Sequence, residues 1–239
     1  MKVDILAIGV HPDDVELSCS GTLLRQMNLG HSVAIVDLTQ GELGTRGSGQ
    51  LRLQEADTAA KILGIHQRTN LGIPDGFFEL TEDHKRKVAQ VIRTYQPDIV
   101  LANAIDDRHP DHGRAAKLVY DACFLAGLNK VETYAPSGDL QKRWRPKAIY
   151  NYIQDKLLPA DLIVDITPYL GKKMESILAF RSQFFDPEST EDESPISGKD
   201  FLEFIKARAR TYGRQIGVEF GEGYTVGRPV GVENLLDLR

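Results

Sequence analysis

Cysteines and long apolar runs are both scarce in this sequence of 239 residues. Cys19 and Cys123 are the only cysteines and share no CxxC spacing, so we expect two buried, reduced thiols. No stretch approaches the roughly 18 apolar residues that a membrane span requires, which argues against membrane insertion. The composition, with 41% hydrophobic and 26% charged residues, is that of an ordinary globular protein.

An excess of basic residues is also missing. The 29 lysines and arginines are outnumbered by 34 acidic residues, and the formal net charge is -5. Nucleic-acid binding generally relies on a basic surface that displaces counterions from phosphates, so we expect a small-molecule partner and no nucleic acid. Residues 1–4 lead directly into a predicted strand, without the charged leader and apolar segment of a secretion signal. We therefore expect a cytoplasmic protein.

Short β-branched segments alternate with amphipathic helical patterns along the chain. Strands are predicted at residues 3–10, 33–38, 98–104, 148–153 and 162–166, and helices at residues 15–27, before Gly64, and at 88–95, 115–126, 170–178 and 201–215. This alternation predicts an α/β fold, a Rossmann-like and mostly parallel sheet with helices on both faces, in one domain spanning residues 1–239. Residues 184–199 are rich in Ser, Pro and acidic residues, which predicts a mobile loop; a lid and a plain surface loop both remain open.

The tripeptide His-Pro-Asp occurs twice, beginning at His11 and at His109, each time where a predicted strand gives way to a predicted helix. Proline suits the first position of a helix, where its missing N–H costs nothing, so each histidine is expected at the N-cap. His11 with Asp14, and His109 with His112, are then three residues apart in a first helical turn. Because ligands bind beyond the carboxyl ends of the strands in an open α/β sheet, we expect both pairs to face one point.

Three imidazoles and up to three carboxylates would gather at that point, which matches a catalytic zinc site with an open position for water. A bound divalent ion lowers the pKa of its water to about 7, and a free carboxylate then accepts the proton as water attacks a carbonyl. Fe²⁺ and Co²⁺ accept similar ligands, and the same residue types also form the facial triad of non-haem Fe(II) oxygenases. A metal- or sugar-binding module without catalysis is a third alternative. The remaining histidines, His31, His66 and His84, are predicted to be structural or solvated.

The sequence resembles the LmbE-like (PIG-L) family of zinc-dependent N-deacetylases. Val10–Glu16 carry the family's Ala-His-Pro-Asp-Asp-x-Glu signature with valine in place of alanine, and Arg108–His112 match its second motif. The resemblance spans nearly the whole chain and is closest to the branch of bacillithiol biosynthesis that acts on N-acetylglucosaminyl-L-malate. It implies that an N-acetylglucosamine conjugate is hydrolysed to acetate and a free amino sugar, with diacetylchitobiose or an inositol glycoside as alternative substrates. It also implies a homo-oligomer, a trimer or hexamer.

The resemblance further implies roles for individual residues. His11, Asp14 and His112 would be the metal ligands, and Asp13 would be the general base. His109 would stabilise the oxyanion of the tetrahedral intermediate or protonate the leaving amine.

Other residues are expected to support the reaction or bind the substrate. Asp111 would orient the ring of His109. Arg52 would pair with the carboxylates of a malyl group, and Glu16 would touch substrate or support the ligands through hydrogen bonds. The substrate-binding positions expected in total are Arg52, Arg108, Asp75 and Glu16, with Arg46 and Arg114 as rivals. Some family members offer a tyrosine hydroxyl to the oxyanion, and the candidates for that position here are Phe201, Tyr152 and Tyr224.

Overall fold

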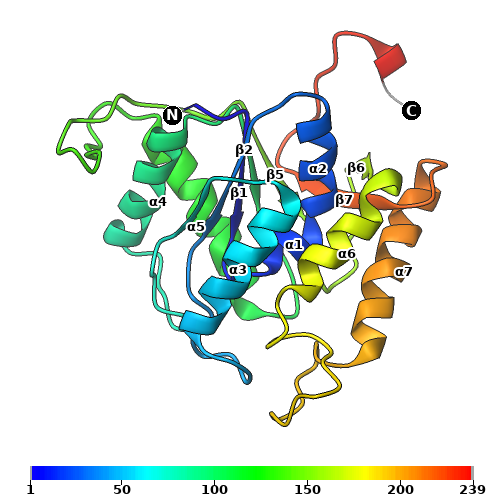
Figure 1. The fold of residues 1–239 in the computed structure, drawn as a ribbon. Helices are drawn as coiled ribbons and strands as arrows, with labels where there is room; N and C mark the ends of the chain where they lie inside the picture. Colours follow the sequence, from blue (N-terminus) through cyan, green and yellow to red (C-terminus); the bar gives the residue numbers. More distant parts are fainter. Residues whose placement is uncertain (1, 238–239) are drawn as a thin grey trace.

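A computed structural model of the chain describes residues 2–237. Seven strands form one sheet in the order β3-β2-β1-β4-β5-β7-β6, and the sheet runs through the middle of the molecule (Figure 1). All neighbouring pairs from β3 to β5 are parallel, whereas β7 is antiparallel to both β5 and β6. The predicted fold class, a mostly parallel α/β sheet, is confirmed. The strands are β1 (Ile5–Gly9), β2 (Val33–Asp37), β3 (Arg68–Asn70), β4 (Ile99–Ala102), β5 (Ala148–Tyr152), β6 (Leu162–Asp165) and β7 (Gly221–Val226).

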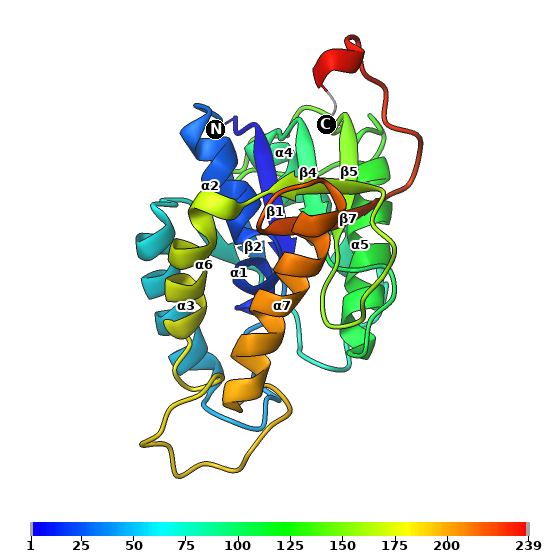
Figure 2. The same cartoon turned by 90° about the vertical axis from the view of Figure 1, so that its right-hand side faces the viewer.

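Helices cover both faces of the sheet, as predicted. Helices α4 and α5 lie on one face, α1, α2, α3 and α6 lie on the other, and α7 packs beside β7 (Figures 1 and 2). The α-helices are α1 (Asp14–Ser18), α2 (Ser20–Asn28), α3 (Gly49–Leu63), α4 (Glu82–Tyr95), α5 (Pro110–Ala126), α6 (Leu170–Leu178) and α7 (Lys199–Gln215). Two 3₁₀ turns complete the elements, η1 (Thr167–Tyr169) and η2 (Leu235–Asp237).

The central strand β1 is buried on both sides, which explains its continuous apolar sequence. Leu6 and Ile8 belong to the core cluster that contains residues of α4 and α5. Ile5 and Ala7 point to the opposite face and belong to the cluster that contains residues of α1, α2 and α3. The alternation follows from the two-residue period of a strand, and it anchors β1 so that the loop after it has a defined position.

The structure differs from the prediction in two strands. β3 has only three residues, all polar or charged, and β7 has two glycines among its six residues. Neither segment has the apolar pattern that predicts a strand. Both are strands because their neighbours, β2 and the β5/β6 pair, supply hydrogen-bonding partners.

The single helix predicted after the first motif is divided into α1 and α2. The break lies at Cys19, whose backbone (φ -140°, ψ 4°) is not helical. Glu222 of β7 accepts a hydrogen bond from the N–H of Gly21 (3.0 Å), and Lys173 of α6 donates to the carbonyl of Leu17 (2.9 Å). The break therefore exposes no unsatisfied helix ends, because residues distant in sequence cap both sides of it.

The segment between Phe184 and Gly198, predicted as a loop, contains only turns and bends. It lies beyond the ends of α3 and α7 (Figure 2) and contacts the loop before α3. The N–H of Gly47 donates to Glu191 (2.8 Å), and Arg46 donates to Ser189. Both cysteines are buried and unpaired, as predicted. In this part of the chain, residues 2–237, no helix has the length and apolar character needed to cross a membrane.

Candidate metal centre

The two His-Pro-Asp motifs lie next to each other at the carboxyl ends of the neighbouring parallel strands β1 and β4. The chain continues from β1 to β2 on one side, and β4 lies on the other side, so a crevice opens between the two connections. The ring centres of His11 and His109 are 4.7 Å apart, and those of His109 and His112 are 5.1 Å apart. The sheet order thus brings together side chains that are far apart in the sequence.

The second motif has the predicted helical geometry. His109 is the N-cap of α5, and Pro110 lies in its first turn. Nδ1 of His109 accepts a hydrogen bond from the N–H of Asp111 (3.3 Å), so the proton of the neutral ring is on Nε2. Burial, and then the charges of His11 and His112, lower the pKa of His109. His109 is therefore a neutral imidazole at pH 7 with a free Nε2–H donor.

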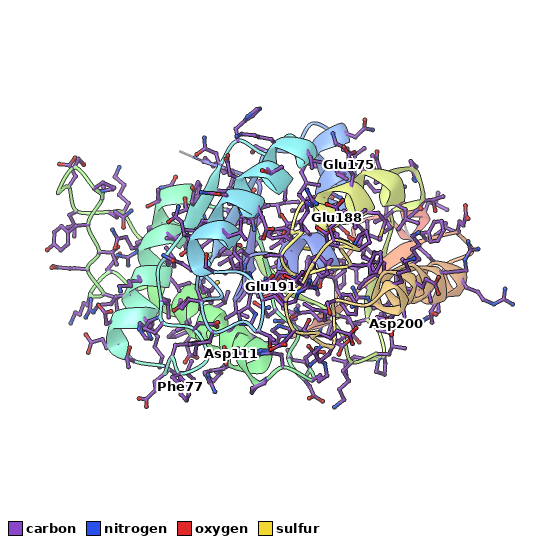
Figure 3. All side chains as sticks on the ribbon, turned by 60° about the horizontal axis from the view of Figure 1, so that its bottom comes forward. Phe77, Asp111, Glu175, Glu188, Glu191 and Asp200 are labelled. Carbon is purple, nitrogen blue, oxygen red and sulfur yellow. The ribbon has the colours of Figure 1, made fainter. Side chains whose placement is uncertain are left out.

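The carboxylate of Asp111 forms its hydrogen bonds with other groups than this ring, so its predicted role in orienting His109 stays a prediction. It accepts hydrogen bonds from Arg114 Nη1 (2.7 Å) and from the N–H of Gly76 (3.0 Å), and one of its oxygens is 3.6 Å from His11 Nε2. Figure 3 shows Asp111 at the beginning of α5. The side chain is fully buried, and its hydrogen bond to Gly76 connects α5 to the loop that follows β3.

The first motif departs from the predicted geometry. α1 begins at Asp14 with Asp13 as its N-cap, so Pro12 is outside the helix. Asp13 has φ 135°, a conformation that L-residues rarely adopt. Its Oδ2 accepts a hydrogen bond from Arg52 Nη2 (2.8 Å). Burial, opposed by the Arg52 charge, raises the pKa of Asp13 to about 7, which suits a group that takes up a proton near neutral pH.

Asp14 lies between two of the imidazoles. Its carboxylate oxygens are 3.7 Å from His11 Nδ1 and 3.2 Å from His112 Nε2. The same carboxylate accepts hydrogen bonds from Asn103 Nδ2 and Gln154 Nε2, both at 2.9 Å. Burial opposes ionisation, but the charges of His112 and His11 hold the pKa of Asp14 well below its usual range. The carboxylate of Asp14 is therefore ionised and held in a fixed orientation, as a metal ligand requires.

A carboxylate supports each of these two imidazoles from behind. Asp75 Oδ1 is 3.1 Å from His11 Nε2, and Asp107 Oδ2 is 2.5 Å from His112 Nδ1. Against the effect of burial, the surrounding carboxylates raise the pKa of His11 to about 10 and that of His112 to about 9. In the metal-free protein both rings consequently hold a proton at pH 7.

This donor set fits a divalent cation. The ligand atoms of His11, His109 and His112 lie within 4.8 Å of one another, as do those of His11, Asp75 and Asp111. A carboxylate on the second ring nitrogen is the usual support of a metal-bound histidine. The protons on His11 and His112 compensate buried negative charge, and a divalent cation that displaces them would do the same.

A cavity of about 320 Å³ opens onto the cluster. Its walls come from both motifs, the loop before α3, residues 194–196, and α7. Leu43, Ile196 and Phe201 give it an apolar side, which suits the ring faces and the methyl group of an acylated sugar. A larger cavity of about 670 Å³ lies at the amino ends of β1, β4 and β5 and contains no residue of either motif, so the smaller one is the candidate active site.

The structure places the predicted substrate-binding arginines in the cavity wall but pairs both of them. Arg52 is buried and bonded to Asp13, while Arg108 is half exposed and forms an ion pair with Asp155. Asp75 also lines the cavity, but its second oxygen accepts the N–H of Leu43 (3.1 Å). These three side chains are therefore engaged by the protein before any substrate binds.

Glu16 is not among the residues that line the cavity. It is completely buried and forms an ion pair with Arg68 (2.5 Å), which also bonds Asp37 of β2 (2.7 Å). Because Glu16 is two positions beyond Asp14 in α1, the helix directs it away from the cluster. Its contact with Arg68 fixes α1 on the sheet and supports the ligands only indirectly.

The sequence reasoning missed four residues of the site: Asn103, Asp107, Gln154 and Arg208. The first three follow the carboxyl ends of β4 and β5, so polar residues directly after buried strands were the signal that could have found them. The tyrosine candidates do not reach the cavity: Tyr152 donates to the carbonyl of Ile8 (2.8 Å), and Tyr224 is in the core. Only Phe201 of that group lines the cavity.

Known proteins are similar to this chain in sequence and in fold. The family model described as GlcNAc-PI de-N-acetylase (PIG-L) matches residues 6–123, which include both motifs. Diacetylchitobiose deacetylase of Thermococcus kodakarensis is 28% identical over 233 residues, covering 92% of this chain and 81% of its own length. A probable N-acetyl-α-D-glucosaminyl L-malate deacetylase of Bacillus anthracis is 26% identical over 197 residues, covering 75% of this chain and 81% of its own.

The solved structures agree with the sequence comparison. The crystal structure of a conserved protein from Thermus thermophilus superposes with a TM-score of 0.86 at 33% identity, and each chain covers 98% of the other. Both motifs, a group of side chains that could hold a metal ion and the α/β sheet are found together in this chain. The chain belongs to the PIG-L (LmbE-like) family of metal-dependent deacetylases.

Proposed function

We propose that this protein removes the N-acetyl group from an N-acetylglucosamine conjugate at a metal centre held by His11, Asp14 and His112. The observation that carries the proposal is the ionised carboxylate of Asp14 between two imidazoles at the base of the cavity. Zn²⁺ is the proposed cation, with Fe²⁺ and Co²⁺ as alternatives, because imidazole and carboxylate ligands suit all three. When bound, the cation supplies a Lewis acid and an activated water.

The residues around this centre divide the proton transfers between them. Asp13 accepts a proton from the attacking water, because its carboxylate lines the cavity and its pKa is raised to about 7. The neutral ring of His109 donates its Nε2–H to the oxygen on which negative charge develops. The proton taken up by Asp13 then passes to the leaving nitrogen, and collapse of the tetrahedral intermediate releases the amine and acetate, so one water and one amide are consumed.

Arg52 positions Asp13 in this scheme. It donates to both the Asp13 carboxylate and the carbonyl of Pro12 at 2.8 Å, which holds the strained turn and the carboxylate together. Its guanidinium is buried and hydrogen-bonded, so it is held in place at the cavity wall. We therefore propose that Arg52 positions the general base Asp13 and does not bind the malyl group.

Among conjugates, N-acetylglucosaminyl-L-malate is the substrate that we propose, with diacetylchitobiose and an inositol glycoside as alternatives. Relatives named for all three substrates are similar to this chain. The guanidinium of Arg208, which lines the cavity and bonds only to carbonyls, favours an anionic aglycone over a neutral sugar. We also propose a homo-oligomer, a trimer or hexamer, by analogy with the family.

One assay tests this function directly. The protein is incubated with each of the three N-acetylated substrates, with and without a chelator, and the release of free amine and acetate is measured. The proposal predicts chelator-sensitive release that does not depend on oxygen. Binding of the sugars without acetate release would instead favour a non-catalytic module. Turnover that requires oxygen would favour the Fe(II) oxygenase, which the α/β sheet already argues against.

A further inference from the structure

Arg208 of α7 reaches the cavity and has no acidic partner. The side chain is only 7% exposed and lines the cavity next to Gln154. Its guanidinium donates hydrogen bonds to the carbonyls of Gln154 and of Leu17, the latter at 2.6 Å. Within residues 2–237 it forms no ion pair with a carboxylate. Because an arginine has five N–H donors, donors remain for a group inside the cavity.

The other arginines of the cavity wall differ from Arg208 in this respect. Arg46 lies 3.8 Å from a carboxylate oxygen of Glu191, a residue labelled on the loop before α7 in Figure 3. Arg52 is bonded to Asp13, and Arg108 is bonded to an aspartate in the loop after β5. Arg208 is therefore the arginine of this wall whose charge is left for a ligand.

The charges behind the cavity point the same way. Lys173, which is also buried, donates to Glu222 (2.7 Å) and to the same Leu17 carbonyl that Arg208 uses. Two buried cations thus share the neighbourhood of one carboxylate. Glu222, Asp155 and Asp107 act on Arg208 only at longer range, and a buried charge that is not directly paired is costly, so an anionic group of a substrate would add the direct partner that it lacks.

We infer that Arg208 recognises a carboxylate on the aglycone of the substrate and thereby selects acidic N-acetylglucosamine conjugates. The inference rests on the proposed deacetylase function. Gln154 joins the two sites, because its carbonyl accepts from Arg208 while its side chain contacts Asp14 (2.9 Å) and His112 (3.4 Å). A group on Arg208 therefore lies close to the reacting amide. In an N-acetylglucosamine conjugate the aglycone and the acetamido group are on adjacent carbons, so both can contact neighbouring side chains of the cavity.

The test compares N-acetylglucosaminyl-malate with its uncharged dimethyl ester. The wild-type protein is expected to have a kcat/KM at least about tenfold higher for the free acid. Arg208→Gln should lower kcat/KM for the acid by about 10- to 100-fold, the range for a charged hydrogen bond, and leave the ester within about threefold. Arg208→Lys should recover part of the loss. Arg210→Gln is the matched control, since Arg210 is exposed on the same helix and pairs with Glu219.

The outcomes distinguish a failure of the proposed deacetylase function from a failure of the role assigned to Arg208. If wild type releases acetate from neither substrate, the proposed deacetylase function fails. If wild type uses acid and ester equally well, the assignment of Arg208 is wrong while deacetylation stands. An equal loss on both substrates in Arg208→Gln, with an unchanged thermal midpoint, would likewise reduce Arg208 to a support of α1. The wild-type comparison needs no variant, so equal use of acid and ester would overturn the assignment even if Arg208→Gln does not fold.

Discussion

The first His-Pro-Asp motif, after β1, and the second, after β4, have the same residues but different backbones. In the second, His109 caps α5, a helix of 17 residues. In the first, the cap is Asp13 with φ 135°, and α1 has only five residues before the break at Cys19. The second motif is thus a regular helix start, whereas the first is a strained turn.

The different backbones of the two motifs give their middle aspartates different surroundings. The strained turn directs the carboxylate of Asp13 toward Arg52 and the cavity, while its counterpart Asp111 is engaged by Arg114 and Gly76. The first histidines of the two motifs also differ. The pKa of His11 is raised to about 10, so its ring is protonated at pH 7, whereas the pKa of His109 is lowered and its ring is neutral. A repeated sequence motif therefore does not imply repeated roles, and each of the following experiments tests one side of this contrast.

The largest effect is expected for Asp13, the middle aspartate of the first motif. Asp13→Asn should reduce kcat by about 100-fold or more, the scale of general-base catalysis, with metal content unchanged. Asp111→Asn is the matched variant and should lose much less activity, because its carboxylate bonds to the protein. Steady-state kinetics and metal analysis of both variants decide it. Equal losses would show that the two motifs are functionally equivalent.

Metal affinity should depend steeply on pH. The pKa values of His11 and His112 are raised to about 10 and about 9 in the metal-free protein, so both rings are protonated below pH 9. Metal binding requires neutral imidazoles, and each motif contributes one such proton. Raising the pH from 6 to 7.5 should therefore increase zinc affinity by up to about 100-fold per pH unit.

Calorimetry in buffers of different ionisation enthalpy measures this proton release. Close to two protons per zinc are expected at pH 7. A value near zero would contradict the assignment of His11 and His112 as the residues that exchange protons for metal.

The supporting carboxylates come next. Asp75→Asn acts on the imidazole of the first motif and Asp107→Asn on that of the second. Each should weaken zinc binding by about 10- to 100-fold, as is typical of such supports. Asp106→Asn is the control, since Asp106 is exposed and pairs with Lys156. Zinc titration against a competing chelator gives the affinities, and an unchanged affinity in both variants would remove these carboxylates from the site.

The smallest effect concerns stability. His109 caps α5, whereas α1 has no side-chain cap. His109→Ala should lower the free energy of unfolding by about 1 kcal/mol, and His109→Asn, a good cap, should retain it. Both should lose activity, because both remove the imidazole. Urea unfolding of the two variants separates the cap from the chemistry, and equal stabilities would show that the Nδ1 contact does not stabilise the helix.

The sequence predicted most of the fold through periodicity. Five strands and the alternation of helices are found where apolar patterns indicate them, and α3 ends before Gly64, which has φ 79°. The sequence did not predict β3 and β7, because their pairing with neighbouring strands and not their composition makes them strands. The sequence did not predict the break at Cys19 either, because apolar residues continue at every fourth position through it. The residues that cap the break, Lys173 and Glu222, come from distant elements.

What the sequence determined by itself is the chemistry available: two motifs at strand ends, with imidazole and carboxylate donors at helical spacing. What the tertiary structure decided is which donors meet. β1 and β4 pair in register from Ile5 with Ile99, and only this pairing places His11 beside His109. The strain at Asp13, the amides that hold Asp14 and the unpaired Arg208 depend on contacts between distant segments, and no local pattern encodes them.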